Sequence, residues 1–285
     1  MSALTAGGGE PEEPGSSGSA DVGPLATRYD ADAAAYGDLW APVLLPFSRR
    51  LVDALPLAGA RVVLDLGAGT GALLGEIRRA APRAVIIAAD RSEGMLRRIP
   101  AGFPRVVIDA RTIPLAAARV DAAVLAFMLF HVPGPGRVLA ETRRVLRAGG
   151  AVGTTTWDGP PTFAAQMAWF EELDAHGARP IADDPTDHRP LDSPGKVARL
   201  LEEAGFEKVR TWTAPFDRRY GRQELIDKLT GMGSAKHRLA SLEPGARTEF
   251  LRAVRRRLEA MPVEDFVDRA TIIFATAVAG AGQKL

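Results

Sequence analysis

A glycine-rich turn directly behind a short apolar run is the clearest chemical signal in this sequence. The run Val62–Leu66 is typical of a strand that is buried on both faces of a parallel sheet. Gly67, Gly69 and Gly71 follow it and remove side chains where the backbone must turn sharply and where a ligand can approach the main chain. Residues 72–77 then have a helical pattern. A strand, a glycine turn and a helix start together predict a site for a nucleotide-like ligand.

Carboxylates lie at the ends of three apolar runs. Asp65 is the next-to-last residue of the first run, and Asp90 and Asp109 close the runs that begin at residues 84 and 105. A carboxylate accepts hydrogen bonds, so it suits hydroxyl, amino or ammonium groups of a ligand. One such acid alone would be interpreted as the cap of a turn. Three acids at one edge of a sheet favour a ligand site.

His131 follows the fourth apolar run, residues 120–127, on the same predicted edge. Its unperturbed pKa suits proton transfer, which makes it the candidate general base. The alternative is a histidine that only stabilises the turn.

The elements that must position these residues alternate regularly between strands and helices. Alternation of this kind predicts an α/β fold with a doubly wound parallel sheet and right-handed crossovers. The predicted strands cover residues 62–66, 84–90, 105–110, 120–127, 151–157, 208–216 and 271–278. A helix over residues 136–147 is expected to stop at Gly149 and Gly150.

The regular alternation ends after Trp157. Helices are predicted over residues 162–176, 194–204, 223–231 and 245–261, so segments 158–193 and 217–262 are expected to form a cap that contributes to substrate binding. Residues 1–24 are rich in Gly, Ser, Pro and Glu and are expected to be a disordered tail. Residues 25–285 are expected to form one domain.

The overall composition excludes several classes of protein. The chain has 285 residues with 36 Lys and Arg against 35 Asp and Glu, a balance that argues against a strongly electrostatic nucleic-acid binder. It has no cysteine, which excludes disulfides, thiolate metal sites and a cysteine nucleophile. We find no long apolar run and no signal-peptide pattern, so a cytoplasmic enzyme without a membrane span is the expectation.

Taken together, the motifs of residues 26–157 resemble those of the class I S-adenosylmethionine-dependent methyltransferases, and in general character the small-molecule enzymes of the quinone-biosynthesis type. Residues 63–71 resemble the first motif of that family, residues 90–96 the second and residues 109–115 the third. Residues 130–133 and 143–150 resemble the exit of the fourth strand and the approach to the fifth. The resemblance implies a Rossmann-like, seven-stranded and mostly parallel sheet with a helical cap.

The resemblance also implies roles for individual residues. Asp65 would orient the glycine turn or bind the ammonium group, Asp90 would bind the ribose hydroxyls, and Asp109 with the Ala110 N–H would bind adenine. Arg91 stands where the family often has an aliphatic residue, and its guanidinium can stack on the adenine ring. The full predicted cofactor site is Tyr29, Asp65, Gly67, Ala68, Gly69, Gly71, Asp90, Arg91, Met95, Asp109, Ala110, Arg111, Ala126 and Phe127.

The expected reaction uses S-adenosylmethionine as methyl donor, gives S-adenosylhomocysteine and needs a small-molecule acceptor. Tyr29 and Tyr36 can close over the cofactor, or they can simply pack between helices. Residues 183–188 hold three carboxylates and an imidazole; a solvated turn is favoured there over a divalent-metal site, and no metal is expected. The acceptor, the methylated atom and the oligomeric state cannot be deduced from the sequence.

Two further interpretations remain open at this point. The chain could bind S-adenosylmethionine without transferring its methyl group and assist another reaction, because a fold does not fix a function. The second open interpretation is a nicotinamide-dependent oxidoreductase, since residues 67–72 also satisfy the dinucleotide fingerprint. Asp90 suits the ribose of a nicotinamide cofactor as well as that of S-adenosylmethionine. A macromolecular methyltransferase lacks support from any appended module or basic excess.

Overall fold

A seven-stranded sheet forms the centre of the protein. The computed structural model describes residues 23–160, 162–182 and 184–280. The strands follow the order β3-β2-β1-β4-β5-β7-β6. The parallel strands are β1 (Val62–Leu66), β2 (Val85–Asp90), β3 (Arg105–Val107), β4 (Val120–Ala126) and β5 (Leu146–Trp157); β7 (Val267–Ala279) runs antiparallel to β5 and to β6 (Phe206–Arg219). The expected mostly parallel, doubly wound sheet is confirmed.

The strand order reverses between β1 and β4, and this reversal positions the ligand site. The crossover from β1 goes to β2 on one side, whereas β4 pairs with β1 on the other side. In open α/β sheets, ligands bind outside the carboxyl ends of the strands at such a point. The glycine turn after β1 and Phe127 after β4 therefore lie at the crevice of the sheet.

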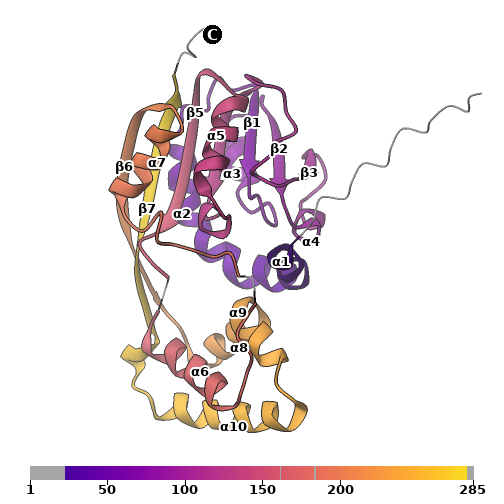
Figure 1. The fold of residues 1–285 in the computed structure, drawn as a ribbon, viewed down its shortest axis with the longest axis vertical. Coiled ribbons are helices and arrows are strands. Elements are labelled where there is room, and N and C mark those ends of the chain that lie inside the picture. The colour runs from indigo at the N-terminus through magenta and orange to yellow at the C-terminus, as the bar shows by residue number, and fades with distance from the viewer. Residues whose placement is uncertain (1–22, 161, 183, 281–285) are drawn as a thin grey trace, which may run out of the picture.

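Helices cover both faces of the sheet (Figure 1). They are α2 (Ala41–Asp53), α3 (Leu74–Ala80), α4 (Glu93–Arg97), α5 (Pro135–Val145) and α7 (Pro194–Glu203). Leu51 and Val52 of α2 are completely buried, and a Cβ at Gly153 of β5 would lie 3.0 Å from Leu51 Cδ1. The small residue in β5 thus lets α2 approach the sheet closely.

The helix predicted over residues 136–147 ends earlier than expected. α5 stops at Val145, and Gly149 and Gly150 lie inside β5. Leu146 already pairs with Val120 of β4, so the chain becomes extended before the two glycines are reached. The glycines form the irregular part of the strand, where the register shifts between Val120 and Ala122.

The N-terminal part of the described chain forms one long helical segment. α1 (Pro24–Ala35) continues through a π-helical turn (Tyr36–Trp40) into α2. Proline is favourable at the start of a helix because its missing N–H would have no partner there. The helix therefore begins at Pro24, the last residue of the predicted disordered tail; residues 1–22 of that tail lie outside the described residues.

Four helices form a separate lobe at one end of the sheet, next to α1 (Figure 1). This helical lobe consists of α6 (Ala164–Ala175), α8 (Arg222–Gly231), α9 (Gly233–Ala240) and α10 (Pro244–Ala260). It has its own core around Trp169, Leu173, Phe250 and Leu258. The sequence predicted three of the four helices. It did not predict α9, which has only Ala235 and Leu239 buried and so lacks a long apolar stripe.

The long strands β6 and β7 connect the sheet to the helical lobe (Figure 1). The first three residues of the predicted cap segment 217–262 still belong to β6, because Asp217–Arg219 pair with β7. Among the described residues, no helix has both the length and the apolar character needed to cross a membrane.

Candidate functional site

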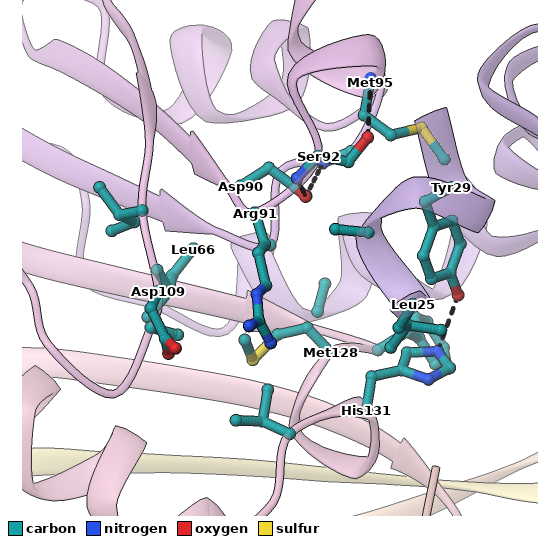
Figure 2. Close-up of a pocket in the computed structure, with 18 of the residues that line it drawn as sticks. Leu25, Tyr29, Leu66, Asp90, Arg91, Ser92, Met95, Asp109, Met128 and His131 are labelled. Atoms are coloured by element: carbon teal, nitrogen blue, oxygen red, sulfur yellow. Dashed lines mark hydrogen bonds between the residues drawn. The ribbon is translucent and has the colours of Figure 1, made fainter. Parts of the chain in front are cut away.

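A cavity lies at the carboxyl ends of β1, β2 and β4, beneath α1, and Figure 2 shows a close-up of its lining. We call it the first cavity. The predicted site residues that line it are Tyr29, Gly67, Gly69, Asp90, Arg91, Met95, Asp109, Ala110, Ala126, Phe127 and His131. Asp65 and Ala68 line a smaller cavity on the other side of the glycine turn. Gly71 and Arg111 line neither of these two cavities.

The glycine turn is held against the neighbouring strand. The N–H groups of Gly67 and Ala68 both donate to the Ala89 carbonyl, at 2.7 and 3.0 Å. Gly67 has φ +78°, and a Cβ there would lie 2.6 Å from Met128 Cβ, so only glycine fits. At Gly71, φ is +80° and a Cβ would lie 2.8 Å from Ile99 Cγ1. Gly71 therefore shapes the turn without lining the cavity.

Asp90 connects this turn to α4. Its Oδ2 accepts a hydrogen bond from the Gly69 N–H at 2.8 Å, and its Oδ1 accepts from the Ser92 N–H at 2.9 Å. Burial raises the pKa of Asp90 above its ordinary value, and these two backbone hydrogen bonds oppose that rise. Each carboxylate oxygen has two lone pairs, so both can still accept a hydroxyl of a ligand.

Asp65 is a buried carboxylate with too few hydrogen-bond donors around it. Its side chain lies on β1, the residue is 2% exposed, and Oδ2 has no hydrogen-bond partner among the described residues. Burial raises the pKa of Asp65 to about 7, and the nearby Asp90 contributes to the rise. A buried polar atom of this kind is costly unless a donor reaches it. An ammonium group on the ligand would satisfy that requirement.

Asp109 is engaged differently from the other two acids. Arg111 holds its carboxylate with both Nη2, at 2.5 Å from Oδ2, and Nε, at 3.0 Å from Oδ1. This ion pair lowers the pKa of Asp109. Arg111 thus acts on Asp109 from outside the cavity, and the adenine-binding role of Asp109 stays a prediction.

Arg91 extends across the first cavity toward Met128 (Figure 2). Its guanidinium lies under the start of α1, since a Cβ at Gly23 would be 3.0 Å from Arg91 Nη2. A planar cation in this place can stack on a flat ring. Met128, which the sequence did not single out, lines the cavity next to Phe127.

α1 closes the first cavity through Tyr29, and Asp30 holds the helix down. Asp30 Oδ1 accepts from the Ser92 hydroxyl at 2.5 Å and from the Gly94 N–H at 2.7 Å. A Cβ at Gly94 would lie 2.8 Å from Asp30 Cα, so the glycine permits this close contact. The ring of Tyr29 faces the cavity, as Figure 2 shows.

A second cavity of about 270 Å³ lies between α1, the exit of β4 and the helical lobe. It shares Leu25, Tyr29, Tyr36, Phe127 and His131 with the first cavity. Its remaining lining is mostly aromatic or polar: Arg28, Asp32, Trp40, Leu44, Phe130, Trp157, Asp184, Thr186, His188, Met232, Gly233, Ser234 and His237.

His131 is hydrogen-bonded at both ring nitrogens. Nε2 lies 2.9 Å from the Tyr29 hydroxyl, and Nδ1 lies 3.0 Å from Thr186 Oγ1. Burial lowers the pKa of His131 to about 4, and the neighbouring His188 contributes. The imidazole is therefore neutral near pH 7, the form that can accept a proton. Burial also raises the pKa of Tyr29, so its hydroxyl keeps its proton.

Phe127 lies between the two cavities, and its backbone is strained. It has φ 54°, in the left-handed region that residues other than glycine rarely adopt. Its N–H donates to the Thr155 carbonyl at 3.0 Å, and its ring lies 5.2 Å from that of Trp157. Strain of this kind persists where the surroundings fix it, and it occurs often at functional sites.

The acidic loop at residues 183–188 forms part of the second cavity. Asp183 lies outside the described residues, Asp184 pairs with Arg28 at 3.3 Å, and the ring of His188 stacks on Phe130 at 4.4 Å. Within the described part of the chain, no three His, Asp or Glu residues are grouped as metal ligands. The sequence did not predict that this loop contributes Thr186 and His188 to a cavity, because nothing in its spacing shows where a long loop folds back.

Comparisons with known proteins agree with this geometry. A family model described as a methyltransferase domain matches residues 64–153. A ubiquinone/menaquinone biosynthesis C-methyltransferase of Syntrophotalea carbinolica is 30% identical over 175 residues, which are 56% of this chain and 74% of that protein. The first curated relatives match over only 34% and 49% of their own lengths.

Solved structures share the fold. Phosphoethanolamine N-methyltransferase 2 of Haemonchus contortus, solved in complex with S-adenosyl-L-methionine, has a TM-score of 0.52 at 15% identity over 90% of this chain and 57% of that one. The cyclase SpnF has a TM-score of 0.50 at 18% identity over 83% of this chain and 81% of that one. At these identities the likeness concerns the fold.

The relative from Syntrophotalea carbinolica and the methyltransferase-domain match agree with the motifs, with the strand order and with the cavity beneath α1. The chain belongs to the class I S-adenosylmethionine-dependent methyltransferases.

Proposed function

We propose that this protein transfers the methyl group of S-adenosylmethionine to a small, uncharged aromatic acceptor. The observation that carries the proposal is the common wall of the two cavities, formed by Tyr29, Phe127 and His131. A donor in the first cavity and an acceptor in the second would meet at this wall. Holding the two reactants in contact and away from water is the main task of such an enzyme.

The residues of the first cavity, together with Asp65 in the smaller cavity on the other side of the glycine turn, suit the three parts of the cofactor. The unsatisfied Asp65 carboxylate fits the ammonium group, and the Asp90 carboxylate fits the ribose hydroxyls. The sulfonium of the bound cofactor supplies an electrophilic methyl group. Tyr29 covers the site and excludes water, because Asp30 fixes α1 to Ser92 and Gly94. Arg91 can stack on the adenine.

The second cavity is suited to an uncharged, planar acceptor. Its walls include the rings of Trp40, Phe130 and Trp157. Both of its described carboxylates have cationic partners: Asp184 pairs with Arg28, and Asp32 pairs with Lys236. The cavity therefore presents little unbalanced charge to a ligand. A quinol or a related phenol matches this lining better than a carboxylate or a phosphate ester does.

We assign His131 as the base that takes the proton from the acceptor. In a neutral imidazole one nitrogen accepts, and Nε2 is the nitrogen that faces Tyr29 at the common wall. Thr186 holds the other nitrogen and thereby fixes the orientation of the ring. An acceptor hydroxyl that replaces the Tyr29 hydroxyl at Nε2 would pass its proton to the imidazole as the methyl group is transferred.

One observation favours a second candidate function, in which the chain binds S-adenosylmethionine without using its methyl group. Both nitrogens of His131 are already hydrogen-bonded to hydroxyl groups, and burial makes it a weak base. The cyclase SpnF has a similar fold, so the fold by itself does not require methyl transfer. In this alternative, the second cavity would promote a reaction of its own ligand while the cofactor stays intact.

Formation of S-adenosylhomocysteine separates the two candidates. The purified full-length chain is incubated with S-adenosylmethionine and either 1,4-naphthohydroquinone, 2,7-dihydroxynaphthalene, malonate or phosphoethanolamine, and products are quantified by mass spectrometry. We expect S-adenosylhomocysteine only with the aromatic hydroxyl compounds. Tight cofactor binding with no S-adenosylhomocysteine from any of them would favour the second candidate, and turnover of phosphoethanolamine would contradict the proposed acceptor class.

A further inference from the structure

The wall of the second cavity that comes from α1 and α9 holds a carboxylate and an imidazole in contact. His237 Nε2 lies 3.1 Å from Asp32 Oδ2, although the two residues are 205 positions apart in the chain. Asp32 is 4% exposed, and both residues line the cavity. A carboxylate in contact with an imidazole fixes which ring nitrogen carries the proton.

Asp32 is held firmly enough to orient this imidazole. Its Oδ1 accepts from Lys236 Nζ at 2.5 Å, and its Oδ2 also accepts from the Gly233 N–H at 2.8 Å. An ionised carboxylate only accepts hydrogen bonds, so His237 Nε2 must carry the hydrogen that points to it. In the neutral ring, Nδ1 is then unprotonated and acts as an acceptor.

We propose that His237 Nδ1 binds a second hydrogen-bond donor on the acceptor, a hydroxyl or an amino group remote from the atom that is methylated. The inference rests on the proposed function, in which this cavity holds the acceptor. Nδ1 makes no hydrogen bond to any residue in the described part of the chain, whereas both nitrogens of His131 are occupied. The acceptor is accordingly a flat molecule with two polar ends. His131 faces one of them and His237 the other.

This arrangement makes His237 a specificity-determining residue. It belongs to the helical lobe, and its partner Asp32 belongs to the helix that also covers the first cavity. The aromatic lining accepts many flat molecules of similar size, so it discriminates weakly between them. A fixed ring nitrogen that the bound ligand covers discriminates better, because a ligand without the second donor leaves that nitrogen unsatisfied.

Binding of two matched probes tests the inference without any turnover. The probes are 2,7-dihydroxynaphthalene and 2-hydroxynaphthalene, which differ by one hydroxyl. Trp40 and Trp157 line the cavity, so quenching of tryptophan fluorescence reports binding to the full chain saturated with S-adenosylhomocysteine. One net hydrogen bond of about 1 kcal/mol corresponds to about a fivefold preference for the dihydroxy probe.

His237→Phe keeps a ring and removes the nitrogens, and it should bind both probes equally. His176→Phe is the matched control, because His176 directly follows α6 of the helical lobe and does not line the cavity. S-adenosylhomocysteine affinity, measured by calorimetry, shows whether each variant is folded. Equal affinity of wild type for the two probes, no binding of the dihydroxy probe to wild type, or a preference that survives in His237→Phe would each overturn the inference. Failure of the proposed methyl transfer would appear separately, as absent S-adenosylhomocysteine formation in the turnover assay.

Discussion

Asp65→Asn should stabilise the protein in the absence of cofactor and weaken its binding of S-adenosylmethionine. Burial without sufficient donors raises the pKa of Asp65 from 3.8 to about 7. A rise of this size corresponds to at most about 4 kcal/mol by which the folded protein disfavours the ionised carboxylate. Asparagine has nearly the same shape and carries no charge, so it avoids that cost.

The sign of the pH dependence follows from the same value. Between about pH 4 and pH 7 the folded chain binds the Asp65 proton more tightly than the unfolded chain does. This carboxyl group therefore makes the wild type lose stability as pH rises through that range. The stability difference between Asp65→Asn and wild type should be near zero at pH 4, grow up to about pH 7 and stay level above it.

Urea unfolding of both proteins without cofactor, at pH 5 and at pH 8, measures this difference. Asp227→Asn, the same substitution at an exposed position of α8, is measured alongside as the control. Calorimetry on the same samples should show S-adenosylmethionine affinity lowered by about ten- to a hundredfold in Asp65→Asn, as expected for the loss of a charged hydrogen bond. A variant less stable than wild type at pH 8, or one with unchanged affinity, would refute the reasoning about Asp65.

Three further outcomes are expected. Gly67→Ala places a Cβ 2.6 Å from Met128 Cβ at φ +78°. Thermal unfolding should therefore show that the folded state loses about 2 kcal/mol or more of stability, and calorimetry should show a loss of cofactor binding. A stable variant that binds the cofactor normally would show that the turn can relax. Asp30→Ala removes the acceptor for Ser92 and Gly94 and should weaken S-adenosylmethionine binding about tenfold with little change in melting temperature, whereas unchanged binding would mean that α1 is not a functional lid. His131→Ala should lower the turnover rate about a hundredfold or more. The wild-type rate should stay level from pH 8 to pH 5 and fall as the pH approaches 4, where His131 becomes protonated. A fall centred near pH 6.5 would contradict the assignment of His131 as the base.

The central sheet could be predicted because its signals are local. Each buried strand is an apolar run, and the glycine turn after β1 is followed at once by a helical pattern. Acids near the ends of β1 and β2 reach one edge of the sheet because parallel strands with crossovers end at the same side. The first cavity therefore contains most of the residues that the sequence predicted for the cofactor.

The second cavity could not be predicted, because its contacts join segments that are distant in the chain. His237 meets Asp32 across 205 residues, and Thr186 meets His131 across 55. Neither contact leaves a periodic pattern. Arg111 shows a different reason: the motif identifies its position, but whether its guanidinium faces a ligand or Asp109 depends on the local conformation of the loop.

A crystal structure of the full-length protein with S-adenosylhomocysteine is the most direct test of the account, because the central claim is that the donor and the acceptor meet at the wall shared by the two cavities. We expect the amino group of the ligand at Asp65, its ribose at Asp90, and its sulfur at the wall of Tyr29, Phe127 and His131, facing the second cavity. A ligand bound outside the first cavity and the adjoining smaller cavity at Asp65, or with its sulfur turned away from the common wall, would contradict this claim.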